Sequence, residues 1–362
     1  MPKAHFKPFS VEGGGHAVNM YLTAQDRAVF GAPVKGQCSR PYLYGKDGQL
    51  ERLLSQIEGR YSGVIGRLAA DHSGLDDTDR WLLRYFTLLQ SHRTAEQIER
   101  GFARMWEMAS FFRMAEERHG NEWDARQDPT RERVMVELML SFSEQMQERV
   151  LDDLKVAIVR NRSNRDFVTS DDPAVTTNRW LLQRRSIKTF GSNAAGLVLL
   201  MPLGPRFLAL IYDPAVYSVS ASSPGWVDLD RASDVQAFNV HQYMRAISAI
   251  YFRREEDAPL VAAEFKAARE HRPDRWDRFT VAKKADEGVT HTRYDVGTPD
   301  EIAGEDAIMF HLAREWPTPP RWPSILKYRH GAHGFTNGRT IVRRARIHDF
   351  VSDKPITYRR VG

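Results

Sequence analysis

The sequence predicts an α+β fold, in which a helical unit is followed by a mostly antiparallel sheet with inserted helices. Two observations indicate this class. Apolar residues recur at helical spacing from residue 49 to about residue 158, and from about residue 155 onward short β-favouring runs alternate with turn residues. Helices and strands that are segregated along the chain in this way are typical of α+β proteins.

Three stretches follow one another along the chain. Residues 1–48 are predicted to form an irregular, glycine-rich N-terminal segment with short strands, such as the run AVNMYLTA. Residues 49–158 form the helical unit. Residues 159–362 form the α+β unit, which ends in a basic C-terminal stretch.

The first two helices are predicted from their apolar spacing. The run QLERLLSQIEGRYSGVIGRLAA has apolar residues at 54, 57, 61, 64, 65 and 68, and the run beginning DDTDRWLLRYF has them at 82, 86 and 89. The second run opens with an Asp-rich cap. A further helix is expected after Asp128 and Pro129, which form a cap and first-turn pair.

Composition excludes several classes of protein. The single cysteine, Cys38, rules out an internal disulfide and a Cys-rich zinc site. No apolar run approaches the roughly 20 residues that a membrane-spanning helix needs, and the N-terminus lacks the apolar core of a secretory signal. We therefore expect a soluble, cytoplasmic protein with no membrane association.

Charge is unevenly distributed. Residues 321–362 contain ten Lys and Arg against two Asp, a net charge of +8, so the remainder of the chain carries −3 of the total of +5. A basic end of this kind could bind nucleic acid through its phosphates. Alternatively, Arg343, Arg344 and Arg346 could decorate an edge strand, where charge discourages aggregation.

Polar residues occur on faces of the predicted helices that are otherwise apolar. Glu51 and Glu58 share a face of the first helix, and Gln90 and Arg93 are three residues apart on the second. If the two helices pack antiparallel, Glu58 could meet Gln90 or Arg93. The pattern indicates either a structural ion pair or a polar pocket with a perturbed carboxylate.

The stretch RDFVTSDDPAV is predicted to be a short strand that runs into a turn. An Asp near a Pro commonly forms an Asx turn, in which its carboxylate accepts a backbone N–H two residues on. The alternative is that Asp171 forms a carboxylate cluster with Glu51 or Glu58, with His5 as acid or base. Such a cluster suits a hard divalent cation, which prefers oxygen ligands.

Several motifs together resemble a known family. AHFKP, YLYGKDGQLERLLSQIE, LLQSHRT, FVTSDDPAV and LLMPLGPRFLALIY occur in the order seen in bacterial domain-of-unknown-function family 4238, over roughly residues 3–253. The matching positions are His5, Glu51, Glu58, Gln90, Arg93 and residues 169–173. After His5 and Pro8 this chain continues directly into FSVEGGG, so a strand of the family is shortened here. The resemblance implies a shared pocket and a bacterial origin, and it supplies no reaction.

From these residues we predict a metal-dependent nuclease of a bacterial toxin or antiphage defence type. The expected catalytic residues are His5, Glu51, Glu58 and Asp171, with Mg²⁺ or Mn²⁺ bound by Glu58 and Asp171. The expected substrate-binding residues are Gln90, Arg93, Thr169 and Ser170. The alternative is a non-enzymatic binding or sensor protein that recognises a phosphorylated ligand or a partner protein.

Overall fold

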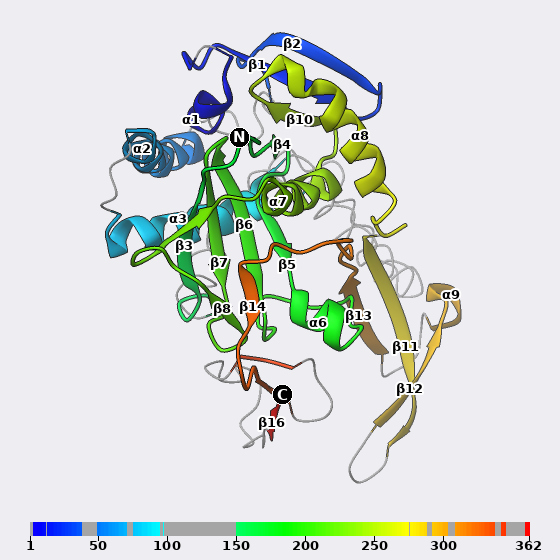
Figure 1. Cartoon of the computed structure of the whole chain (residues 1–362). Coiled ribbons are helices and arrows are strands. Elements are labelled where there is room, and N and C mark those ends of the chain that lie inside the picture. The colour runs from blue at the N-terminus through cyan, green and yellow to red at the C-terminus, as the bar shows by residue number, and fades with distance from the viewer. Residues whose placement is uncertain are drawn as a thin grey trace.

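The structure is a computed structural model of the 362-residue chain. It describes residues 3–11, 13–37, 49–70, 75–94, 97, 150–274, 276–287, 292–302, 308–336, 342–344 and 359–362. In these residues the predicted α+β class is confirmed, with most strands paired antiparallel (Figure 1). The helix expected after Asp128 lies outside them.

A five-stranded sheet forms the centre of the molecule. Its strands lie in the order β5-β6-β7-β3-β9, and their bounds are β5 (Val175–Thr177), β6 (Val198–Gly204), β7 (Phe207–Tyr212), β3 (Lys155–Asn161) and β9 (Trp226–Leu229). The β3–β9 pair is parallel and the other pairs are antiparallel. The hairpin-like turn predicted within LLMPLGPRFLALIY is the connection between β6 and β7.

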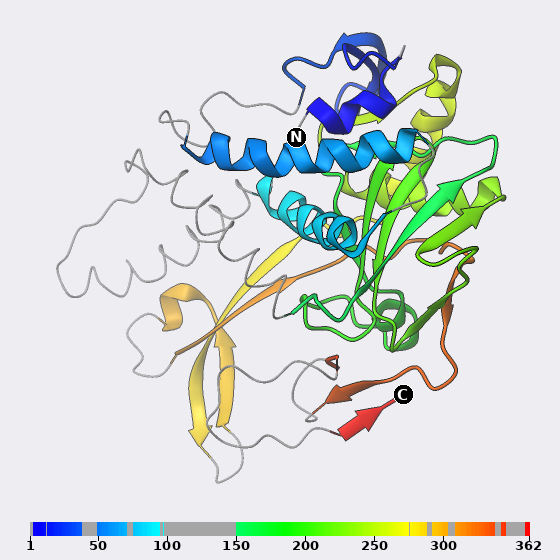
Figure 2. The same cartoon turned by 90° about the vertical axis from the view of Figure 1, so that its left-hand side faces the viewer.

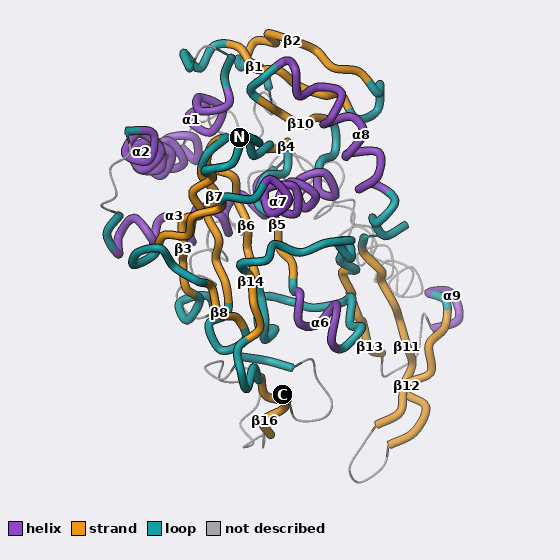
Figure 3. Tube along the Cα trace, in the orientation of Figure 1, coloured by secondary structure: helices purple, strands orange, loops and turns teal. Residues whose placement is uncertain are grey.

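Helices cover both faces of this sheet (Figure 3). Side chains alternate between the faces along a strand, so Ala157 and Val159 belong to one apolar core and Ile158 to another. The Ile158 core is closed by α2 (Gln49–Ala69) and α3 (Asp77–Arg93), and the opposite core by α6 (Arg179–Arg184) and α7 (Ala232–Arg245). Because helices cover both faces, the centre of the sheet is buried.

The helices α2 and α3 pack antiparallel, side by side (Figure 2). Glu58 pairs with Arg93 near one end, and Arg67 pairs with Asp79 near the other. The predicted Asp-rich cap is present, because the side chain of Asp76 accepts the backbone N–H of Asp79 at 2.8 Å.

A four-stranded sheet joins the N-terminal segment to the α+β unit. Its order is β2-β1-β10-β4, with bounds β2 (Arg27–Pro33), β1 (Ala17–Leu22), β10 (Ala249–Phe252) and β4 (Thr169–Ser170). Helix α1 (Lys3–Phe6), a 3₁₀ turn (Lys7–Phe9) and helix α8 (Ala258–Arg269) pack near it. Strands β1 and β2 of the N-terminal segment therefore share a sheet with strands from the last of the three predicted stretches.

The remaining elements lie beyond the two sheets. A three-stranded sheet of β12 (Thr292–Gly297), β11 (Asp277–Glu287) and β13 (Ile308–Arg314) projects from the body in two views (Figures 1 and 2). The others are β8 (Tyr217–Val219) with β14 (Leu326–Tyr328), β15 (Gly334–Thr336) with β16 (Arg359–Val361), α9 (Pro299–Ile302) and a 3₁₀ turn (Glu255–Asp257). No described helix combines the length and apolar character that crossing a membrane requires.

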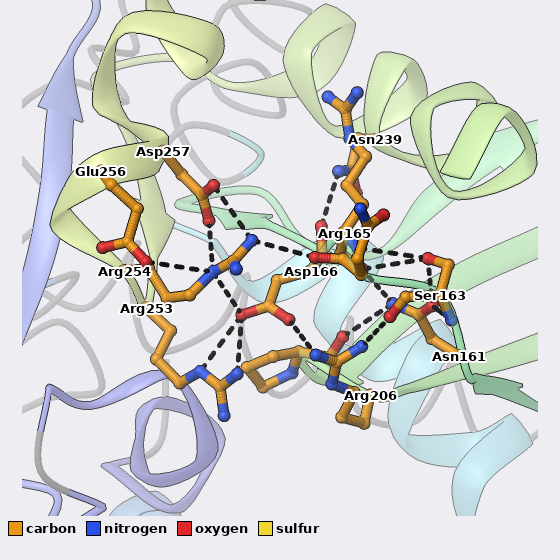
Figure 4. A network of polar contacts seen from close by, with 12 residues as sticks. Asn161, Ser163, Arg165, Asp166, Arg206, Asn239, Arg253, Arg254, Glu256 and Asp257 are labelled. Atoms are coloured by element: carbon orange, nitrogen blue, oxygen red, sulfur yellow. Dashed lines mark hydrogen bonds and ion pairs between the residues drawn. The ribbon is translucent and has the colours of Figure 1, made fainter. Parts of the chain in front are cut away.

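The buried carboxylate of Asp166 links the two larger sheets (Figure 4). Its side chain is 3% exposed and forms ion pairs with Arg206 at 3.1 Å, Arg253 at 2.9 Å and Arg254 at 3.5 Å. Arg206 lies in the turn between β6 and β7, whereas Arg253 and Arg254 follow β10. One desolvated anion thus balances guanidinium groups from both sheets.

We expect Asp166→Asn to destabilise the protein by ~3 kcal/mol, because the amide leaves the arginines without their shared counter-charge. The value is at the low end for a buried pair since the three arginine side chains are about one third exposed. Denaturant unfolding measures the change. Asp257→Asn, which removes an outer partner of Arg254, is the control and should cost less than ~1 kcal/mol. Equal effects of the two variants would contradict the linking role.

Candidate functional site

A chain of hydrogen bonds through His5 connects three elements. His5 lies in α1 with no exposed surface, Nδ1 is 2.9 Å from the Tyr61 hydroxyl of α2, and Nε2 is 3.0 Å from the Thr169 hydroxyl of β4. The Tyr61 ring stacks on Phe86 of α3, with ring centroids 3.9 Å apart. The structure therefore brings together two of the predicted site residues, His5 and Thr169, in the interior.

Burial determines the charge of His5. Desolvation lowers the pKa of its imidazole to about 3, and the positive charge of Arg93 acts in the same direction. The ring is neutral at physiological pH, so one nitrogen donates a hydrogen bond and the other accepts one. A neutral imidazole with this pKa is a weak general base.

Beside this chain, Arg93 joins α2 to α3. Its Nη2 donates to Glu58 Oε1 at 2.7 Å, and its Nε donates to Gln90 Oε1 at 2.8 Å. The Arg93 side chain is 3% exposed and the Glu58 side chain is 30% exposed. The contact expected from an antiparallel helix pair is present, and the arginine charge is balanced at the edge of the interior.

Two donors in this group have no acceptor among the described residues. Gln90 Nε2 and Arg93 Nη1 are both buried and form no hydrogen bond. Buried donors are almost always paired in folded proteins. We name His5, Tyr61, Thr169, Glu58, Gln90 and Arg93 the His5 cluster. Glu51, by contrast, is exposed two turns before Glu58 on α2 and lies outside this cluster.

The remaining polar residues of the TSDDP stretch bind other elements. The Ser170 hydroxyl donates to Gln242 Oε1 of α7 at 3.0 Å. Asp172 forms a buried ion pair with Arg245 at the end of α7 and accepts a hydrogen bond from Gln97 at 3.0 Å. Ser170 and Asp172 therefore hold α7 against β4.

The Asx turn predicted at Asp171 or Asp172 does not form at Asp171. Its carboxylate accepts the backbone N–H groups of Ile247 at 2.9 Å and Ser248 at 2.6 Å, in the segment before β10. The residue two positions on is Pro173, which has no N–H to donate. Burial raises the pKa of Asp171, while these backbone hydrogen bonds oppose the shift.

Both predicted metal ligands already have hydrogen-bond donors. Glu58 is bound by Arg93, and Asp171 by two backbone amides. Within the described ranges, no three His, Cys, Asp or Glu side chains are grouped as a metal site requires. Binding of Mg²⁺ or Mn²⁺ by these two carboxylates stays a prediction, and it requires each to exchange its present partner.

The basic C-terminal stretch is partly buried where the structure describes it. Arg344 has a side chain that is 1% exposed and pairs with Asp153 at 3.0 Å. It also donates to backbone oxygens of Val150, Ser192 and Ala194. Arg346 lies outside the described residues. Arg344 thus anchors this part of the chain to the body of the protein, and nucleic-acid binding by the basic stretch stays a prediction.

A groove that the sequence reasoning missed lies beside α3. It has a volume of about 600 Å³, and its lining combines cationic and aromatic side chains: Arg80, Trp81, Arg84, Lys155, Tyr212 and Arg329, with Asp77 at its edge. We name it the cationic groove. One pattern in the sequence pointed to this groove. Arg80 and Arg84 are four residues apart and therefore lie on one face of the helix, opposite the apolar face of Leu82 and Phe86.

Comparison with known proteins identifies a family whose function is unknown. A sequence profile described as "Protein of unknown function (DUF4238)" matches residues 1–256, which is most of the chain. This match confirms the resemblance predicted from the motifs. Searches of curated proteins and of solved structures gave no match. The chemistry of the sites must therefore be argued from their geometry.

We expect Glu58→Gln to reduce the free energy of unfolding by ~3 kcal/mol, because it leaves the buried Arg93 guanidinium without a counter-charge. Thermal or denaturant unfolding measures the loss. Glu51→Gln removes an exposed carboxylate from the same helix face and should change stability by less than ~0.5 kcal/mol. If Glu58→Gln were as stable as Glu51→Gln, the ion pair would have no structural role.

Stability should fall as the pH is lowered from 6.5 towards 3. In this window the unfolded chain protonates His5, whose ordinary pKa is 6.5, whereas the folded protein does not, since its pKa is about 3. Between pH 7 and pH 5 the protonation of His5 in the unfolded chain lowers the free energy of unfolding by ~2 kcal/mol. His241, whose pKa burial also lowers to about 3, acts in the same direction.

The contribution of His5 is isolated by His5→Gln, which keeps hydrogen-bonding capacity and does not titrate. The free energy of unfolding is measured for both proteins at pH 7 and at pH 5. Over this interval the wild type should lose ~2 kcal/mol more than the variant. Parallel losses in the two proteins would mean that His5 is not buried as a neutral imidazole.

Proposed function

We propose that this chain, which belongs to the DUF4238 family of proteins of unknown function, is a non-enzymatic binding protein that recognises a phosphorylated ligand in the cationic groove. The observation that carries the proposal is the charge of the lining. Four cationic side chains, Arg80, Arg84, Lys155 and Arg329, face a single carboxylate, Asp77.

Two of the cations are available to a ligand. In the described part of the chain neither Lys155 nor Arg329 has a carboxylate partner, and both are exposed. Arg80, in contrast, pairs with Asp77 at 2.9 Å. Because the charges of Lys155 and Arg329 are not balanced within the fold, they favour an anion in the groove.

Arg84 is held by hydrogen bonds in a position where it can bind the phosphate group. Its Nη1 donates to the backbone oxygens of Asp152 at 3.0 Å and Leu154 at 2.9 Å, and the residue lines the groove wall. A guanidinium presents a planar fork of donors that suits phosphate oxygens. An arginine fixed before binding loses less conformational entropy when the ligand arrives.

Size and wall chemistry support an organic phosphate over a bare ion. A volume of about 600 Å³ falls in the range of small-molecule sites, ~300–1,000 Å³. Trp81 lines the groove, is 39% exposed and stacks on Tyr85 with ring centroids 5.2 Å apart. Its indole offers an apolar surface beside the cations, which fits a ligand that has both a phosphate and a carbon framework.

The metal-dependent nuclease has less support from the geometry. Its predicted ligands, Glu58 and Asp171, are bound by Arg93 and by backbone amides, and His5 is a weak base. The proposed binding function needs no exchange of partners within the fold. Nuclease activity remains a separate prediction, which a cleavage assay on RNA and DNA with Mg²⁺ or Mn²⁺ tests directly.

Lys155→Gln should weaken binding of phosphorylated ligands about tenfold or more, because a charge-assisted contact contributes ~1.5–3 kcal/mol. Isothermal titration with ATP, a 5′-phosphorylated hexanucleotide and pyrophosphate measures the effect. Lys327→Gln is the matched control, since Lys327 is an exposed lysine on β14 that does not line the groove. Its affinities should stay within about twofold of wild type.

Equal affinities of the Lys155→Gln and Lys327→Gln variants, or no measurable binding of any probe to the wild type, would overturn the proposal. Cleavage of the hexanucleotide by wild type in the presence of Mg²⁺ or Mn²⁺, lost in Glu58→Gln, would favour the nuclease instead.

A further inference from the structure

We propose that a second, smaller site binds a single phosphate-sized oxyanion where the projecting three-stranded sheet meets the body. The site is a cavity of about 110 Å³, whose polar lining includes Arg245, Arg314, Ser91, Thr176 and Ser192, with Trp316 as an aromatic wall. We name it the oxyanion cavity. It is distinct from the cationic groove, with which it shares no lining residue.

Two guanidinium groups line the cavity. Arg245 and Arg314 line it, and no carboxylate among the described residues does. The acidic partners of these arginines, Asp172 and Asp277, contact them from outside the lining. The lining among the described residues therefore presents guanidinium groups and no carboxylate to a bound ligand.

The two cations lie close to one another. Their guanidinium carbons are 6.0 Å (Arg245) and 5.6 Å (Arg314) from the ring centroid of Trp316. They are consequently less than about 12 Å apart, in a part of the molecule where water screens charge poorly. An anion in the cavity can contact both guanidinium groups, because both line it.

Hydrogen-bond donors are also present. Arg314 Nη2 is buried and has no acceptor within the described structure. The hydroxyl-bearing residues Thr176 and Ser192 belong to the same lining, whereas the Ser91 hydroxyl already donates to the Leu88 backbone oxygen at 2.7 Å. A tetrahedral oxyanion has acceptor oxygens in several directions, so it can serve donors that surround it, as inorganic phosphate and sulfate do.

The size of the cavity selects the ligand class. Its volume of about 110 Å³ exceeds the ~30 Å³ share of one water molecule and is well below the ~300 Å³ of the smallest sites for drug-sized molecules. One phosphate or sulfate fits, and a nucleotide does not. A small carboxylate shares the negative charge but offers fewer acceptor oxygens.

The position of the cavity gives the ligand a structural effect. Arg314 ends β13, Arg245 ends α7, and Thr176 lies in β5. Trp316 donates from Nε1 to the Phe190 backbone oxygen of the body at 2.9 Å. An oxyanion held by Arg245 and Arg314 would thus tie the projecting sheet of β11–β13 to α7 (Figure 1).

Thermal unfolding and isothermal titration test the site, with phosphate, sulfate, acetate and chloride compared at equal ionic strength. We expect phosphate and sulfate to raise the melting temperature of wild type saturably, and acetate and chloride to do so much less. Arg314→Gln should weaken phosphate binding at least tenfold. Arg278→Gln is the matched control, because Arg278 lies on the same sheet but is 72% exposed and does not line the cavity.

Two further variants keep the test decisive. Lys155→Gln, which weakens the cationic groove, should retain the phosphate response. Ser192→Leu fills the cavity and leaves both arginines in place, so adding it to Lys155→Gln should abolish this response even if Arg314→Gln fails to fold. No saturable response in wild type, or a response of Lys155→Gln that survives the addition of Ser192→Leu, would overturn the proposal.

Discussion

The constraint on which the rest of the structure depends is that the polar residues of the TSDDP stretch are buried and must be paired inside the protein. Thr169, Ser170 and Asp172 are at most 1% exposed, and an unpaired charge there would cost several kcal/mol. Each therefore binds a different partner: His5 of α1, Gln242 of α7 and Arg245 at the end of α7. The TSDDP stretch, α1 and α7 are consequently fixed to one another by polar contacts rather than by apolar packing alone.

This pairing explains why the interior polar group suits structure and recognition better than acid–base chemistry. A catalytic carboxylate or imidazole needs a pKa near the working pH and access to a substrate. Burial drives the pKa of His5 far below that range, and Glu58 is neutralised by Arg93. The exposed cations without a carboxylate partner in the described part of the chain are instead Lys155 of β3 and Arg329 after β14.

Local spacing predicted the contacts that depend on one or two helices. Gln90 and Arg93 meet because they are three residues apart, and Glu58 reaches Arg93 because antiparallel helices bring such faces together. The partners of Asp171 are 76 and 77 residues away, and no local pattern encodes such a separation. The cationic groove escaped prediction for the same reason, since Arg84, Lys155 and Arg329 come from three distant segments.

The central position of β1 in its sheet has a consequence for biosynthesis. This strand is synthesised before its neighbour β10, which follows more than 220 residues later, with register pairs such as Tyr21 with Ile250. Contacts so distant in sequence make folding slow, because a long loop must close before they form. The edge of β1 that pairs with β10 therefore has no partner strand until β10 has been synthesised. The family match ends at residue 256, four residues after β10, and it therefore covers all four strands of this sheet.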